Sequence, residues 1–90
     1  MIRSFRSKAL RAYFETGNPK GLSVPNAERV GRILAVLDDA TRPEDANVPG
    51  FRFLSLEGAA RWSIRVTGNW RITFGWDCAN IVEVDLEDYR

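Results

Sequence analysis

Apolar and polar residues alternate one by one over residues 61–76, and this is the clearest pattern in the chain. The apolar residues of the stretch are Trp62, Ile64, Val66, Trp70, Ile72, Phe74 and Trp76. Thr67-Gly68-Asn69 interrupts the alternation with residues that suit a tight turn. Because successive side chains of a strand point to opposite faces, the pattern predicts a β-hairpin with one apolar and one polar face.

Two segments before this hairpin have the spacing of amphipathic helices. The first runs from Ser7 to Thr16 and stops at Gly17. The second runs from Pro25 to about Ala40. Proline suits the first position of a helix, because the N–H that it lacks has no partner there. The apolar residues that recur every three or four positions are Leu10, Tyr13, Phe14, Val30, Ile33, Leu34 and Leu37.

Two further strands are predicted, a short one over residues 51–56 and a last one over residues 81–86. In the last strand, the residues expected to face the core are Val82, Val84 and Leu86, and those expected on the other face are Glu83 and Asp85. Consecutive strands joined by short turns pair antiparallel. We therefore predict one α+β domain over residues 1–90, with two N-terminal helices packed on one face of an antiparallel sheet of about four strands.

The composition fits a folded domain and excludes several classes of protein. The chain has 90 residues, 44% of them apolar, with no apolar run long enough to cross a bilayer and no segment resembling a signal peptide. Cys78 is the one cysteine and there is no histidine, so we expect no internal disulfide, no metal site and no cofactor. These features favour a cytoplasmic protein without a membrane partner.

The net charge of +1 conceals an uneven distribution of charge. Residues 3–11 include basic side chains and no acidic one, residues 61–71 hold three arginines, and the charged residues of 77–88 are all acidic. One interpretation is that these are solvated faces, with the arginines paired to Glu83 and Asp85. The other is a basic surface that binds phosphate, beside acids that take part in chemistry or contact a cationic partner.

Five short segments together carry a more specific pattern. They are Met1-Ile2-Arg3-Ser4-Phe5-Arg6, Leu37-Asp38-Asp39-Ala40-Thr41, Trp62-Ser63-Ile64-Arg65-Val66, Asn69-Trp70-Arg71-Ile72-Thr73-Phe74 and the closing Glu87-Asp88-Tyr89. These segments resemble the HigB-type killer toxins of the RelE/ParE superfamily of bacterial toxin–antitoxin systems, and the resemblance extends over essentially the whole chain.

The resemblance implies a RelE/ParE-like fold and a ribosome-dependent endoribonuclease that cleaves mRNA and inhibits translation in the bacterial cytoplasm. It also implies a HigA-type antitoxin with a helix-turn-helix, through which the toxin is brought to operator DNA. The ribosome and mRNA are the other expected partners.

Two positions depart from the family pattern. Arg90 follows Asp-Tyr where the family usually ends in histidine, and Glu57 stands where a lysine is common. We therefore expect weakened cleavage activity. Two alternatives remain open: a catalytically silent homologue that acts only as the antitoxin's partner and co-repressor, and a ParE-like inhibitor of DNA gyrase.

Metal-free RNA cleavage needs a base for the ribose 2′-OH, a cation for the charged phosphorane and an acid for the leaving 5′-oxygen. Arg71 is the expected cation, because its planar guanidinium is always charged and fits two phosphate oxygens. Residues expected to contact RNA are Arg52, Glu57, Arg61 and Arg65. The expected catalytic set is Arg71, Asp88, Tyr89 and Arg90.

The base is the least defined of these groups. Arg90 cannot act as a base, since its guanidinium stays protonated. The candidates are Asp88, Glu57, Asp85 and Tyr89, and a carboxylate with an ordinary pKa is a weak base at neutral pH. Tyr89 is also expected to orient the 2′-OH or to stack on a base, or else to cover the end of the sheet. Trp62, Trp70 and Trp76 are predicted to belong to the core, because base-stacking residues lie on the open face.

Overall fold

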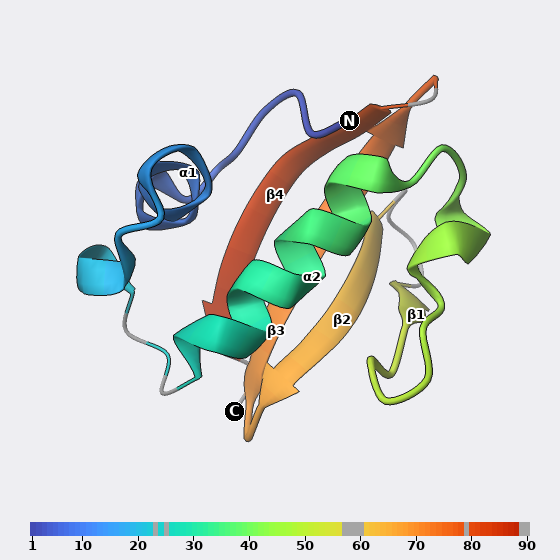
Figure 1. Ribbon diagram of the computed structural model, residues 1–90. Helices are drawn as coiled ribbons and strands as arrows, with labels where there is room; N and C mark the ends of the chain where they lie inside the picture. Colours follow the sequence, from blue (N-terminus) through green and yellow to red (C-terminus); the bar gives the residue numbers. More distant parts are fainter. Residues whose placement is uncertain (23, 25, 57–60, 79, 89–90) are drawn as a thin grey trace.

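The computed structural model describes residues 1–22, 24, 26–56, 61–78 and 80–88 (Figure 1). Its helices are α1 (Lys8–Thr16) and α2 (Ala27–Asp39), with short 3₁₀ turns at η1 (Pro19–Gly21) and η2 (Pro43–Ala46). Its strands are β1 (Leu54–Leu56), β2 (Arg61–Thr67), β3 (Trp70–Asp77) and β4 (Asn80–Asp88). The strands form an antiparallel sheet in the order β1-β2-β3-β4. The predicted α+β class and four-stranded sheet are confirmed.

The two helices lie on the same side of the sheet but contact it differently. α2 runs across one face of the sheet, and α1 lies against α2 and β4 (Figure 1). Four residues of α2 are buried, which covers its apolar stripe, whereas in α1 Leu10 is buried and Phe14 is exposed. Burial of such side chains stabilises the fold by roughly 1.5–3 kcal/mol each.

Short polar side chains define the helix ends. Ser7 precedes α1 and its Oγ accepts the Leu10 N–H at 3.2 Å, while Gly17 ends α1 with a left-handed φ of 75°. Asn26 caps α2, and its Oδ1 accepts the Arg29 N–H at 3.1 Å. α2 therefore begins two residues later than predicted, because the cap is Asn26; Pro25 lies outside the described residues.

The N-terminal segment lies along the outer edge of β4. Ile2 forms a parallel bridge with Ile81, and Phe5 forms one with Val84. The Arg3 N–H donates to the Ile81 carbonyl at 2.7 Å. A strand edge presents unpaired N–H and C=O groups, so this segment protects β4 from pairing with another chain.

A β-bulge in β4 shifts the alternation of the residues that precede it, while Val84 and Leu86 keep their predicted side. Gly75 pairs with Val82 and Thr73 pairs with Asp85, so one extra residue lies on β4 between them. Glu83 in this bulge has a φ of 55°, a value that side chains disfavour. As a result Ile81 and Val84 are fully buried, and Val82 shares a row with Gly75 on the opposite face. The prediction that Val82 faces the core is therefore wrong.

The core lies between α2 and the sheet. Its largest fully buried side chains are Leu10, Ile33, Leu34, Leu37, Ile64, Ile72, Phe74 and Ile81. The three tryptophans are partly buried and pack against this core, and the Trp62 ring stacks on Phe74 with centroids 6.4 Å apart. The prediction that the tryptophans belong to the core is confirmed.

Candidate functional site

The face of the sheet turned away from α2 carries the arginines, and we call it the polar face. Arg65 on β2, Arg71 on β3 and Glu87 on β4 lie directly opposite one another across the three strands. Arg61 is on the same face, because residues 61, 63 and 65 alternate regularly along β2. The predicted grouping of the three arginines on one face is confirmed.

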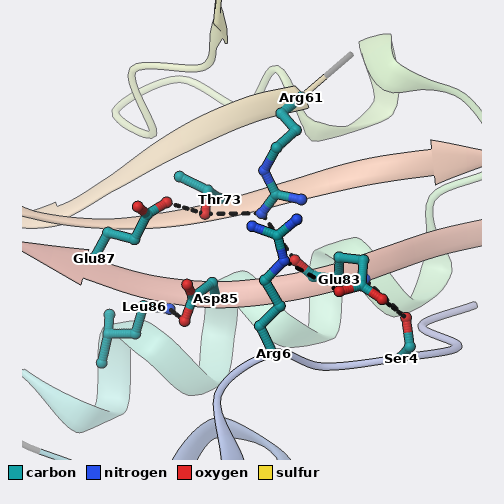
Figure 2. Close-up of polar contacts among 8 residues, drawn as sticks. All are labelled: Ser4, Arg6, Arg61, Thr73, Glu83, Asp85, Leu86 and Glu87. Carbon is teal, nitrogen blue, oxygen red and sulfur yellow. Dashed lines mark hydrogen bonds and ion pairs between the residues drawn. The ribbon is translucent and has the colours of Figure 1, made fainter. Parts of the chain in front are cut away.

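Arg61 is held across the strands. Its Nη2 donates to Thr73 Oγ1 at 3.0 Å and to the Glu83 carbonyl oxygen at 2.8 Å (Figure 2). The guanidinium thus extends from β2 over β3 to the bulge in β4. Its Nε and Nη1 have no hydrogen-bond acceptor within the described parts of the chain, which leaves one side of the fork for a ligand.

Thr73 links this arginine to an acid. Its side chain is fully buried although it lies on the polar face, and its hydroxyl donates to Glu87 Oε2 at 2.5 Å (Figure 2). A hydroxyl can donate one hydrogen bond through its single proton and can also accept bonds through its oxygen. The Thr73 hydroxyl does both, since it accepts from Arg61 and donates to Glu87. Arg61, Thr73 and Glu87 therefore form one hydrogen-bonded chain across β2, β3 and β4.

The acids expected to neutralise the arginines are engaged elsewhere. The Glu83 carboxylate accepts from Arg6 Nε at 3.1 Å and from the Ser4 hydroxyl at 3.5 Å (Figure 2). Asp85 Oδ1 accepts the Leu86 N–H at 2.9 Å. Arg61 contacts Glu83 only through its backbone carbonyl. The interpretation in which the polar-face arginines pair with the Glu83 and Asp85 carboxylates therefore does not hold for Arg61.

Of the remaining predicted site residues, the structure describes Asp88 and Arg52. Asp88 ends β4 opposite Trp70, in a row that belongs to the apolar face. Arg52 precedes β1, is exposed and has a φ of 50°. Glu57, Tyr89 and Arg90 lie outside the described residues. Their expected roles stay predictions.

Two members of the site, Thr73 and Glu87, were not among the predicted site residues. Both lie on the polar face, and Glu87 is directly opposite Arg71. The predicted last strand ended at residue 86, whereas β4 continues to Asp88. In a strand of that length the spacing of Asp85 and Glu87 puts both acids on one face, which is the signal that could have identified Glu87.

Within the described residues, no group of three or more metal-ligating side chains comes together. No helix in that same part of the chain is long and apolar enough to span a membrane.

Comparison with known proteins identifies the proteins that this chain resembles. A family model described as the RelE-like toxin of the type II toxin–antitoxin system HigB matches residues 3–89. The Endoribonuclease HigB of Proteus vulgaris is 34% identical over 92 residues, an alignment that covers 100% of this chain and 100% of that protein.

Proposed function

Because the chain belongs to the HigB-like family of RelE-like toxins of type II toxin–antitoxin systems, we propose that it is a ribosome-dependent endoribonuclease that cleaves mRNA and inhibits translation. The name of its Proteus vulgaris relative supports RNA cleavage. The observation that carries most weight is the cross-strand pair of Arg65 and Arg71 on the polar face. Like charges placed opposite each other repel, and a phosphate bound between them offsets that repulsion.

Arg71 is the proposed cation for the transition state. It is half-buried at the centre of the polar face, with Arg65 on one neighbouring strand and Glu87 on the other. A charge that is partly removed from water acts more strongly on a phosphorane than an exposed one. Arg65 and Arg61 then hold the neighbouring phosphates, which positions the RNA without reading its sequence.

We also propose that cleavage does not require a metal. The substrate carries its own nucleophile in the ribose 2′-OH, and the arginines of the polar face stabilise the developing charge. The partner of a type II toxin is its antitoxin. We propose a HigA-type antitoxin with a helix-turn-helix, which also brings the toxin to operator DNA, and the bacterial cytoplasm as the place of action.

The test is cleavage of mRNA on programmed ribosomes by the purified chain, mapped by primer extension. We expect cuts within codons, and a loss of about 10²- to 10³-fold in the cleavage rate for Arg71→Ala. Arg32→Ala, an exposed arginine of α2, is the matched control and should cleave at the unchanged rate. Equal rates for both variants would contradict the role of Arg71.

The same cleavage assay tests whether Arg90 weakens the cleavage activity, as the sequence predicts. If Arg90 limits the rate, Arg90→His should cleave faster than the unmodified chain. Tight antitoxin binding without any cleavage would instead indicate a silent homologue. Growth arrest with DNA damage signalling and intact mRNA would indicate an inhibitor of DNA gyrase.

A further inference from the structure

Among the described carboxylates, Glu87 lies nearest to the proposed cation along the sheet register. It is directly opposite Arg71 on the neighbouring strand, and side chains in such positions have Cβ atoms roughly 4.5–5.5 Å apart. Arg65 lies opposite Arg71 on its other side. A phosphate between the two arginines therefore places the ribose that carries it within reach of Glu87.

One oxygen of this carboxylate is fixed and the other is available. Glu87 Oε2 accepts the Thr73 hydroxyl, whose direction is set because Thr73 Oγ1 also accepts from Arg61 (Figure 2). Glu87 Oε1 has no hydrogen-bond donor within the described part of the chain. Glu87 is half-buried, so this oxygen is reachable without being freely mobile in solvent. A base must be held in this way before it can accept a proton from a bound substrate.

The other described carboxylates of β4 are less well placed. Glu83 is paired with Arg6 at the outer edge of the strand, and Asp85 accepts the N–H of the next residue. Asp88 lies in the row of Trp70, on the apolar side of the sheet. Of these acids, Glu87 alone combines a polar-face position with a fixed orientation beside the arginine pair.

We propose that Glu87 is the general base of RNA cleavage and that Thr73 is the residue that positions it. Glu87 Oε1 takes the proton of the ribose 2′-OH, and the 2′-oxygen forms a bond to the adjacent phosphorus. The bond from phosphorus to the 5′-oxygen breaks, and this oxygen takes a proton from water. The products are a 2′,3′-cyclic phosphate and a free 5′-OH, and Glu87 returns its proton to solvent. This inference rests on the proposed function.

The first test compares Glu87→Gln with the unmodified chain in single-turnover cleavage of mRNA on programmed ribosomes. Gln has the same shape and can still accept from Thr73, but it cannot take a proton. We expect the rate to fall by about 10²- to 10⁴-fold while ribosome affinity stays unchanged. Glu28→Gln is the matched control, since Glu28 is exposed on α2, and it should retain the full rate.

Chemical rescue separates a base from a structural group. In Glu87→Ala, added formate should restore part of the lost rate, because a small carboxylate can occupy the space left by the side chain. Thr73→Val should lower the rate about tenfold, the effect of losing one hydrogen bond to a charged group. Thr73→Ser keeps the hydroxyl and should recover most of the rate. Thermal unfolding of each variant checks that the fold is retained.

The outcomes are distinguishable. Cleavage by Glu87→Gln at close to the unmodified rate would overturn the inference and leave the proposed function intact. A loss of rate that follows a matching loss of ribosome affinity, without rescue by formate, would also overturn it. No cleavage by the unmodified chain would overturn the proposed function and the inference together.

Discussion

Arg65 and Arg71 lie directly opposite each other on β2 and β3, so the sheet places two like charges in one cross-strand pair. Such a pair lowers stability by a few tenths of a kcal/mol to about 1 kcal/mol. The Arg65 guanidinium has no hydrogen-bond or ion-pair partner within the described residues, because the bonds to Arg29 and Phe51 are made by the Arg65 backbone. The pair is therefore unfavourable for folding and favourable for binding an anion.

Replacing Arg65 should separate these two effects. We expect Arg65→Gln to raise the free energy of unfolding by about 0.5 kcal/mol at low salt, because the repulsion is removed. The same variant should bind single-stranded RNA more weakly and show a smaller dependence of binding on salt. Urea unfolding and RNA titration at several salt concentrations measure the two quantities. A less stable variant with unchanged RNA affinity would contradict both expectations.

The sequence predicted the polar face because residues 61–65 of β2 pair in regular register with residues 71–75 of β3. The turn between them forms at Gly68, where φ is 55°, and the arginines follow from simple alternation. The predicted start of α2 was two residues too early. Pro25 and Asn26 both suit a helix N-terminus, and only the structure shows that Asn26 is the cap.

The bond between Thr73 and Glu87 was beyond the reach of the sequence. It depends on the register of β3 against β4, and that register contains the bulge at Glu83. Glutamate has no preference for a left-handed φ, so nothing in the sequence marks the extra residue. A pattern of alternation therefore identified which β2 and β3 residues share a face, but not which side chains meet across β3 and β4.

The contact between α1 and α2 depends on a glycine. The Tyr13 hydroxyl donates to the Ala27 carbonyl at 2.9 Å, and a Cβ on Gly31 would lie 2.8 Å from the Tyr13 oxygen. Alanine at position 31 therefore displaces the tyrosine hydroxyl and breaks its bond. Alanine also has a higher helix propensity than glycine, by about 1 kcal/mol.

These opposing effects predict non-additive mutations. Gly31→Ala alone should change the free energy of unfolding little, since the gain in helix propensity offsets a lost hydrogen bond of about 1 kcal/mol. In a Tyr13→Phe background the same change should stabilise the protein by about 1 kcal/mol. A double-mutant cycle by urea unfolding measures the coupling. Equal effects of Gly31→Ala in the two backgrounds would show that the hydroxyl does not occupy this space.

Ser63 and Thr73 are opposite each other on β2 and β3, both fully buried, yet their hydroxyl groups differ in bonding. Ser63 Oγ has no hydrogen-bond partner within the described residues, whereas Thr73 Oγ1 has two. Ser63→Ala should therefore stabilise the protein by about 1 kcal/mol, because an unsatisfied buried hydroxyl is removed. Thr73→Ala, the matched control, should destabilise it by about 1–3 kcal/mol. Urea unfolding that ranks the two variants the other way would reveal a partner for Ser63.

The turn η2, which follows α2, should respond to pH through Asp45. The Thr41 backbone N–H, which donates to Asp45 Oδ2 at 3.0 Å, lowers the pKa of this carboxyl below its ordinary value of 3.8. The Thr41 hydroxyl and Arg42 lower the pKa further, while desolvation opposes the shift.

A carboxyl whose pKa is lower in the folded chain than in the unfolded chain stabilises the fold when it is ionised. That contribution is complete above the ordinary value of 3.8 and is lost as the pH falls through the lower folded pKa. Asp45→Asn should therefore be less stable than the unmodified chain at pH 7, and the difference should disappear in strong acid. Glu44→Gln, which changes the exposed acid next to it, should show no such convergence. Urea unfolding of the three proteins across this pH range measures the effect. If the stability difference between Asp45→Asn and the unmodified chain stays constant down to strong acid, the ionised Asp45 carboxylate does not stabilise the fold through these bonds.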